Sequence, residues 1–324
     1  MSSPKILILG AAGYMGGDFL VELLKTHPAA NITTLVRSEA QIPLLKPLGV
    51  NVYLGSVEAD TVGPLAAAHD VVVNFAVPFG GGDAAISAII ESLEQRAATH
   101  TKPVLIHTVG TGTVLSGTDG EAPTGAKWSD DEPERWEALP DTAYFQSGTR
   151  LVVRAAERGL ISAYVVTSPT VYGVGKGPGK KVSLQVPDYV AYAKENGQAA
   201  YIGKGENVWG NVHVSDLTSL YLAVLAHALQ NPAKTAGTER GWSNLVYSGV
   251  GEHNWKDVVT AIGDALHAKG EVKAAGAISI PEGTGKGYMF GGSSVLAQSK
   301  KARALGWVPK AKGIVETVVA DIEA

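Results

Sequence analysis

Three glycines near the start of the chain have the spacing of a phosphate-binding turn. The stretch KILILGAAGYMGG passes from an apolar run into Gly10, Gly13 and Gly16 and then resumes with helical spacing. Gly10 permits a tight turn, Gly13 lets the backbone approach a pyrophosphate, and Gly16 lets the next helix pack closely on a sheet. The helix that begins near Tyr14 offers unpaired N–H groups and the positive end of its dipole. This pattern predicts a dinucleotide-binding site.

The elements that hold this turn have the pattern of an α/β sheet. Apolar runs alternate with amphipathic stretches, and the runs VVVNFAV and VLIHTV scarcely alternate in polarity, as in strands covered on both faces. We predict strands at Lys5–Leu9, Asn31–Val36, Asn51–Leu54, Asp70–Phe75, Pro103–Val109 and Ser162–Ser168. One helical stripe consists of Met15, Phe19, Leu20, Leu23 and Leu24, and a second consists of Ala85, Ile86, Ile89, Ile90 and Leu93. This order predicts an α/β fold with a Rossmann doubly wound parallel sheet.

The alternation of strands and helices ends near Gly173. The segment GVGKGPGKK is a loop rich in glycine and lysine, and helical stretches follow at about 186–195 and 217–229. We therefore expect a Rossmann domain that binds the dinucleotide at residues 1–173 and a smaller, discontinuous substrate-binding domain at 174–324. The chain is expected to return to the first domain around residues 211–230.

Composition indicates a globular protein and excludes several classes of partner. The 324 residues are 45% apolar and 18% charged, with a net charge of -4. This charge offers no basic field to nucleic acid or to an anionic membrane, and no apolar run reaches the roughly 20 residues that span a bilayer. Cysteine is absent, which excludes thiol chemistry and fits a cytoplasmic protein. The eight histidines form no ligand-like cluster, so no metal site is expected.

Other polar residues are expected to be structural or solvated. His107 and His213 lie in apolar, strand-like surroundings, which predicts hydrogen-bonded histidines without a catalytic role. Five acidic residues gather in SDDEPERWE, residues 129–137, and we predict a solvated surface loop there.

Motifs along nearly the whole chain resemble those of one superfamily. The glycine turn is spaced G-x-x-G-x-x-G, and it is followed in order by VVVNFA, VLIHTVGTGTV, PTVYGVGKGP, NVHVSDL and LGWVPK. These stretches resemble the extended and atypical short-chain dehydrogenases/reductases (SDR), and their combination is most similar to fungal-type epimerase/dehydratase-like and NmrA-like proteins. The resemblance implies that a nicotinamide dinucleotide is bound by Gly10, Ala12, Gly13, Tyr14, Met15, Phe75, Ala76, Thr108, Pro169, Thr170 and Val171.

The residues after the second predicted strand bear on the choice of cofactor. In NAD-preferring relatives this strand ends in an acidic residue that accepts from the adenosine ribose hydroxyls. Here Val36 is followed by Arg37, whose guanidinium can pair with a 2′-phosphate and stack on adenine, and by Ser38, which can add a hydrogen bond. Glu39 leaves ribose binding by a carboxylate open as the alternative. We predict that NADP(H) is preferred over NAD(H).

The resemblance also implies catalytic groups, with one departure from the family pattern. SDR enzymes combine a tyrosine, a lysine four residues later and a serine or threonine hydroxyl. In AYFQSGTR the tyrosine is Tyr144, but Gly148 occupies the lysine position and Arg150 lies six residues on. Gly110 overlays the family's serine, so Thr111 is the better hydroxyl candidate. Without the lysine a phenol can donate a proton but is a poor base near neutral pH, and a purely structural tyrosine remains the alternative.

The substrate is expected at the carboxyl ends of the strands, beneath the second domain. Candidate wall residues are Phe79, Tyr172, Trp209 and Asn211. Aromatic and amide groups without a convergent cationic pair favour a neutral organic substrate over a nucleotide sugar.

Two kinds of function follow from these residues. The first is an NADP(H)-dependent oxidoreductase of the extended or atypical SDR type, which acts on a carbonyl or alcohol of a small organic molecule through Thr111 and Tyr144. Its variant is an epimerase, dehydratase or isomerase that retains its cofactor. The second, favoured by the missing lysine, is a non-enzymatic NmrA-like sensor of dinucleotide redox state with a protein partner. A homodimer is the oligomeric form considered.

Overall fold

A seven-stranded parallel sheet lies at the centre of the computed structural model, which describes residues 3–76, 82–99, 102–231 and 241–323. Its strand order is β11-β7-β5-β4-β1-β2-β3. The strands are β1 (Ile6–Leu9), β2 (Ile32–Val36), β3 (Asn51–Leu54), β4 (Val71–Asn74), β5 (Val104–Gly110), β7 (Ser162–Ser168) and β11 (Leu245–Tyr247). The predicted Rossmann-type α/β fold is confirmed, and each of the six predicted strands agrees to within one residue at either end.

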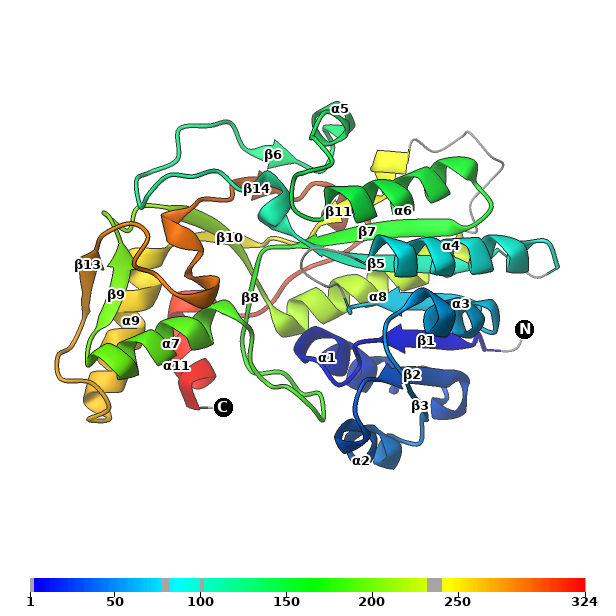
Figure 1. Cartoon of the computed structure of the whole chain (residues 1–324), viewed down its shortest axis with the longest axis horizontal. Coiled ribbons are helices and arrows are strands. Elements are labelled where there is room, and N and C mark those ends of the chain that lie inside the picture. The colour runs from blue at the N-terminus through cyan, green and yellow to red at the C-terminus, as the bar shows by residue number, and fades with distance from the viewer. Residues whose placement is uncertain (1–2, 77–81, 100–101, 232–240, 324) are drawn as a thin grey trace.

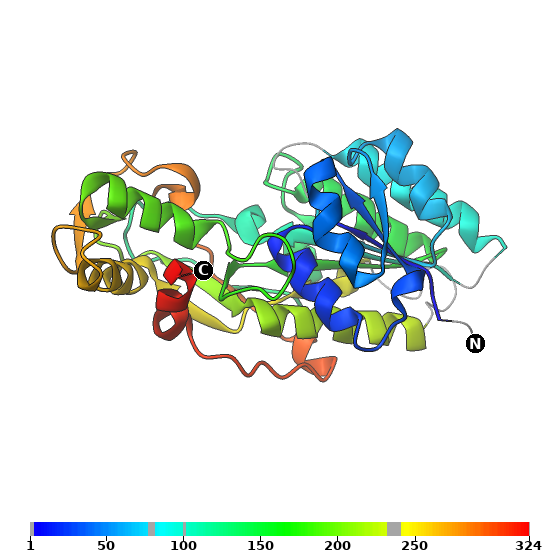
Figure 2. The same cartoon turned by 90° about the horizontal axis from the view of Figure 1, so that it is seen from below.

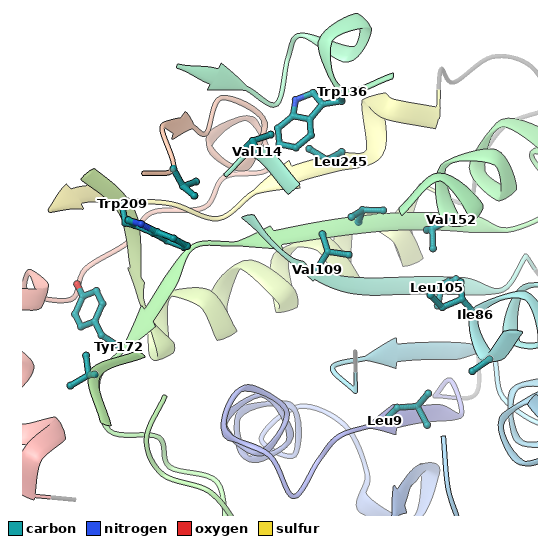
Figure 3. Packing of buried hydrophobic residues seen from close by; sticks show 14 of the residues in the cluster. Leu9, Ile86, Leu105, Val109, Val114, Trp136, Val152, Tyr172, Trp209 and Leu245 are labelled. Carbon is teal, nitrogen blue, oxygen red and sulfur yellow. The ribbon is translucent and has the colours of Figure 1, made fainter. Parts of the chain in front are cut away.

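Helices cover both faces of this sheet (Figures 1 and 2). One face carries α3 (Ala59–Ala67), α4 (Asp83–Ala97) and α6 (Gln146–Arg158), and the other carries α1 (Tyr14–Leu23) and α8 (Val214–Gln230). Side chains alternate between the faces of a strand, so Leu7 and Leu9 of β1 enter one core while Ile6 and Ile8 enter the other. Figure 3 shows Leu9, Leu105 and Ile86 within the first of these cores. Strands that are apolar throughout are what a sheet covered on both faces requires.

A smaller unit lies beyond the carboxyl ends of the strands (Figure 1). It contains the parallel pair β9 (Ala199–Ile202) and β13 (Ala277–Ile280), with helices α7 (Gln185–Asn196), α9 (Trp255–Ala268) and α11 (Ile314–Glu323). The ring of Tyr189 on α7 stacks on Trp255 of α9, with ring centroids 4.6 Å apart.

A three-stranded sheet joins this unit to the large sheet. Its strands are β8 (Thr170–Tyr172), β10 (Val208–His213) and β12 (Gly251–Asn254). β8 follows β7 almost directly, and β10 leads directly into α8. Two elements from the second half of the chain thus belong to the large unit: α8 packs on a face of the large sheet, and β11 is its edge strand beside β7.

The acidic segment at residues 129–137 is solvated only in part, since Asp131 and Glu134 are exposed but Asp130 is buried. It contributes to β6 (Trp128–Ser129), which pairs with β14 (Ala297–Gln298), and it contains α5 (Pro133–Glu137). Asp130 is fully buried and accepts hydrogen bonds from the main-chain N–H groups of Tyr247 (3.1 Å) and Lys300 (2.8 Å). The prediction was wrong for Asp130 because main-chain donors from distant segments satisfy this carboxylate.

The remaining short helices are α2 (Ile42–Leu45) and α10 (Lys301–Ala304). Within the described residues no helix is both long enough and apolar enough to cross a membrane. The same residues contain no group of three or more histidine, aspartate or glutamate side chains that could hold a metal ion.

Candidate active site

The glycine turn connects β1 to α1 in a space that admits little more than backbone. Gly10 is in the left-handed region with φ +88°, and a Cβ there would lie 3.2 Å from main-chain atoms of Phe75 and Ala76. A Cβ on Gly16 would lie 2.4 Å from the carbonyl oxygen of Gly10. Gly13 is the N-cap of α1 and makes no side-chain capping bond. The first N–H groups of the helix are therefore left for an anion.

A cavity of about 490 Å³ begins at this turn and extends toward β10. Gly13 and Met15 line one end, Thr111 and Tyr144 line it further on, and Trp209 lines it from β10. Of the residues expected to bind the cofactor, the cavity lining includes Gly10, Gly13, Tyr14, Met15, Phe75, Thr108, Pro169 and Val171. The structure therefore brings the predicted turn and the predicted catalytic pair to one cavity.

The other three residues expected to bind the cofactor do not line the cavity themselves and make hydrogen bonds within the fold. The carbonyl oxygen of Ala12 accepts from the main-chain N–H of Lys180 (3.2 Å). The main-chain N–H of Ala76 donates to Asn74 Oδ1 (3.0 Å), and Thr170 Oγ1 donates to Gln185 Oε1 (2.8 Å).

Arg37 and Ser38 lie just beyond the carboxyl end of β2, beside the glycine turn because β2 pairs with β1. Both residues are exposed and neither lines the cavity. The hydroxyl of Ser38 accepts from the main-chain N–H of Ala40 (3.2 Å). The carboxyl end of β2 beside the glycine turn is thus open to solvent.

The hydroxyl of Thr108 is held by an aromatic cluster under the turn. Its Oγ1 lies 2.6 Å from the hydroxyl oxygen of Tyr221 on α8, and burial raises the pKa of that tyrosine above its ordinary value. The Tyr221 ring packs on Phe75 with centroids 4.7 Å apart. This contact fixes Phe75 at the cavity wall, and it leaves Thr108 with an internal hydrogen-bond partner.

Thr111 and Tyr144 reach the cavity from separate segments. Thr111 follows β5 directly, and its hydroxyl oxygen is buried with no hydrogen-bond partner among the described residues. Tyr144 is 61% exposed, and its carbonyl oxygen accepts from Thr113 Oγ1 at 2.7 Å. A Cβ on Gly112 would lie 3.6 Å from the Cβ of Tyr144. The small residues after β5 therefore let the tyrosine segment approach Thr111.

Phe145 occupies the space beside Gly110. It adopts a left-handed conformation with φ 63° and forms the N-cap of α6. A Cβ on Gly110 would lie 3.0 Å from its ring. The position that overlays the family's serine thus has no room for a side chain unless the ring of Phe145 moves. Phe145 could not be found from the sequence, because its residue type does not reveal its left-handed backbone.

Neither Gly148 nor Arg150 supplies the missing lysine. Gly148 is buried on α6 against α4. Arg150 pairs with Glu137 (3.0 Å) and Asp141 (2.7 Å) and also donates to the carbonyl oxygen of Leu139 (2.8 Å). These contacts tie α6 to the segment before it, and Arg150 does not line the cavity.

The four residues expected to line the substrate site do not lie on one wall of the cavity. Trp209 lines the cavity, and its indole Nε1 donates to the carbonyl oxygen of Ser293 (2.7 Å). The Tyr172 hydroxyl donates to the carbonyl oxygen of Lys312 (2.6 Å), and Figure 3 shows the two rings extending in different directions. Asn211 instead lines a second cavity of about 430 Å³. Phe79 lies outside the described residues.

Both histidines singled out in the sequence are hydrogen-bonded within the fold, as their apolar surroundings predict. His107 Nδ1 lies 3.2 Å from Asn74 Nδ2, and burial lowers its pKa to about 4, so the ring is neutral near neutral pH. His213 Nδ1 lies 2.8 Å from Ser215 Oγ at the start of α8.

Residues 6–236 match the NAD dependent epimerase/dehydratase family. The chain belongs to this family. The match covers more than half of the chain, including the glycine turn and the segments that carry Thr111 and Tyr144. It confirms the resemblance to the extended SDR superfamily.

Two curated relatives are similar to the chain at lower identity. Oxidase ucsJ of Acremonium sp. is 26% identical over 336 residues, which cover 97% of this chain and 95% of the relative. Protein C2A9.02 of Schizosaccharomyces pombe, which is described as uncharacterized, is 26% identical over 243 residues, covering 73% of this chain and 76% of the relative.

Solved structures of extended SDR enzymes share the fold. DesIV of Streptomyces venezuelae, a dTDP-glucose 4,6-dehydratase solved with NAD, matches with a TM-score of 0.67 at 16% identity over 98% of this chain and 97% of that one. UDP-glucuronic acid 4-epimerase of Bacillus cereus, also solved with NAD, matches with a TM-score of 0.66 at 16% identity over 98% of both chains.

Proposed function

We propose that the chain is an NADP(H)-dependent oxidoreductase that acts on a carbonyl or alcohol group of a small, neutral organic molecule. The observation that carries this proposal is the single cavity shared by the glycine turn, Thr111, Tyr144 and Trp209. Membership of a family described as NAD dependent supports a nicotinamide dinucleotide. The similarity to an oxidase over nearly the whole chain is compatible with redox turnover.

The residues of the turn fit such a dinucleotide. A side chain at Gly10 or Gly16 would collide with main-chain atoms, so both positions require glycine. Glycines at these positions are what a dinucleotide-binding turn requires. The uncapped start of α1 suits a pyrophosphate, and the exposed Arg37 beyond β2 suits a 2′-phosphate. When bound, the dinucleotide supplies or accepts the hydride.

Thr111 and Tyr144 would act on the substrate oxygen. In the reducing direction the carbonyl carbon gains a hydride, and the Tyr144 hydroxyl transfers its proton to the developing alkoxide to give an alcohol. The Thr111 hydroxyl, which has no partner among the described residues, would donate a hydrogen bond to the same oxygen. Solvent returns the proton to Tyr144, which is 61% exposed. Since Gly148 offers no ammonium group, proton donation is better supported than proton abstraction.

The walls of the cavity favour an uncharged substrate. Among the described lining residues, Lys180 has the one charged side chain, and the lining also includes the apolar side chains of Leu115, Phe145 and Trp209. A nucleotide sugar would bring two phosphates in addition to those of the cofactor. Burying these phosphates without cationic partners would cost more desolvation free energy than contacts with the apolar walls could offset.

A cofactor-retaining epimerase or dehydratase is the second candidate. It is favoured by the glycine-rich segment after β8, which packs on the turn and on the start of α1. A Cβ on Gly179 would meet the carbonyl oxygen of Ala12, and a Cβ on Gly177 would lie 2.5 Å from the carbonyl carbon of Gly17. Such a cover would slow exchange of the dinucleotide, as a reaction without net cofactor consumption requires.

A turnover screen distinguishes the two. Purified protein is incubated with NADPH and a panel of neutral ketones, aldehydes and alcohols, while NADPH absorbance and products are followed. Alcohol formed in step with NADPH loss supports the oxidoreductase, and product formed with constant NADPH supports the epimerase or dehydratase. If the protein binds dinucleotide, prefers one redox form and captures a protein partner but converts nothing, a sensor is the better description. Failure to bind any dinucleotide would contradict all three.

A further inference from the structure

The glycine- and lysine-rich segment at residues 173–184, here called the strap, lies across the glycine turn. Figures 1 and 2 both show this segment, between β8 and α7, beside α1. A Cβ on Gly179 would lie 2.1 Å from the carbonyl oxygen of Ala12, and a Cβ on Gly175 would lie 3.1 Å from the ring of Tyr14. Together with the contact of Gly177 on Gly17, these approaches explain why alternate residues of the strap are glycine.

Hydrogen bonds hold the strap at this place. The main-chain N–H of Lys176 donates to Asp18 Oδ1 (2.7 Å), and the other oxygen of this buried carboxylate accepts from Thr218 Oγ1 (2.7 Å). The main-chain N–H of Lys180 donates to the carbonyl oxygen of Ala12 (3.2 Å). The strap is therefore joined to both helices of one sheet face and to the turn.

The three lysines of the strap have different environments. Lys176 pairs with Glu22 of α1 (2.9 Å), and Lys181 Nζ donates to the carbonyl oxygen of Gly177 within the strap. Lys180 is exposed and lines the cavity together with Gly10 and Gly13. No acidic side chain lies among the described residues that line this cavity.

We propose that Lys180 binds the pyrophosphate of the dinucleotide, an inference that rests on the proposed function. The turn and the start of α1 supply N–H groups to the phosphates but no full positive charge. The strap places Lys180 on the wall of the same cavity, and a lysine ammonium group is a compact charge on a flexible stem. The pyrophosphate is then bound between the turn and Lys180, and the strap is part of the cofactor site.

The test is a calorimetric titration in which NADPH, NADH and ADP-ribose are each added to the wild type and to Lys180→Met. All three probes contain the pyrophosphate, so each should bind about 10-fold more weakly, the lower range for a hydrogen bond to a charged group. Lys180→Arg should keep most of the affinity, and added salt should weaken the wild type more than Lys180→Met. Lys5→Met is the control, because it removes an exposed positive charge at the end of β1 opposite the glycine turn. Melting temperatures of the variants verify folding.

Several results would overturn the proposal. A loss confined to NADPH would assign Lys180 to the 2′-phosphate, and an equal loss in Lys5→Met would show a general effect of charge. Unchanged affinities with an altered pH profile of turnover would place Lys180 at Tyr144 instead. If the wild type binds none of the three probes, the proposed function itself fails, which is a distinct outcome.

Discussion

Gly148 lies against the end of the Ile86 side chain: a Cβ at residue 148 would be 2.8 Å from Ile86 Cδ1. The residue four positions after Tyr144 is therefore turned toward α4 and not toward the cavity. Tyr144 itself precedes α6, which begins at Gln146, so the two residues are not on successive turns of one helix. The absence of the lysine is thus accompanied by a backbone that would not aim it at the tyrosine.

Gly148→Lys should consequently destabilise the protein without raising turnover. Overpacking a buried site costs about 1–3 kcal/mol, which exceeds the gain of up to about 1 kcal/mol from replacing a helical glycine. Urea unfolding and a turnover assay measure the two effects. Gly125→Lys is the control, since a Cβ at Gly125 meets nothing within 4 Å. Higher turnover in Gly148→Lys would show that the helix can present a lysine to Tyr144.

Tyr144→Phe should lower turnover by about 100-fold or more, the usual contribution of a positioned proton donor, while dinucleotide affinity stays the same. Thr111→Val should lower turnover less, because it removes a hydrogen bond and keeps the shape of the side chain. Steady-state rates and calorimetry separate turnover from cofactor binding. Full turnover in Tyr144→Phe would exclude this tyrosine from the mechanism.

Arg37→Ala should abolish most of the preference for NADP(H) over NAD(H). A hydrogen-bonded charge pair contributes roughly 1.5–3 kcal/mol, which corresponds to about a 10- to 150-fold ratio of affinities. Affinity for NAD(H) should scarcely change, since it has no 2′-phosphate. Gly13→Val provides the contrast, because it should weaken both cofactors at the shared pyrophosphate. An unchanged ratio in Arg37→Ala would refute the cofactor assignment.

Gly177→Ala should loosen the strap. Its Cβ would lie 2.5 Å from the carbonyl carbon and 2.6 Å from the Cα of Gly17, and main chain cannot yield by rotating a side chain. Cleavage by trypsin after the strap lysines and dissociation of dinucleotide should both become about tenfold faster, as a strain near the lower end of the 1–3 kcal/mol range implies. Gly125→Ala is the control. Equal rates in both variants would mean that the strap does not cover the bound cofactor.

Asp321 should make stability fall as the pH rises through the weakly acidic range. Its Oδ2 accepts from the main-chain N–H of Gly173 (3.0 Å), and burial raises its pKa from 3.8 to about 6. The folded state therefore holds this proton more tightly than the unfolded state, so unfolding free energy declines between about pH 4 and pH 6 and is level above that. The drop is on the order of 3 kcal/mol, from two pH units at 1.4 kcal/mol each.

Asp321→Asn keeps an oxygen for Gly173 and removes the titration. Urea unfolding of both proteins from pH 4 to pH 7 should show their stability difference changing across this window only. A constant difference would indicate that Asp321 ionises at its ordinary pH in the fold. Tyr14 and Tyr172 do not interfere, because burial raises the pKa values of both tyrosines.

Local patterns were enough to predict six of the seven strands of the large sheet and the glycine turn, whereas β11 was not predicted. Strands β1, β2, β4 and β5 are apolar because both of their faces are covered, and that pattern is written in consecutive residues. The glycine turn could be located for the same reason, because the three glycines that it requires lie within seven consecutive residues.

Contacts between distant segments were decided by the tertiary structure alone. The sequence identifies the strap as a glycine-rich loop. Its contact with Ala12 and Gly17 depends on the place where β8, which precedes the strap, ends beside α1. Tyr172 and Asn211 were expected on one wall with Trp209, but they contact Lys312 and His253 instead. Residue type states which groups can bond or react, whereas packing of segments far apart in the chain decides which of them meet.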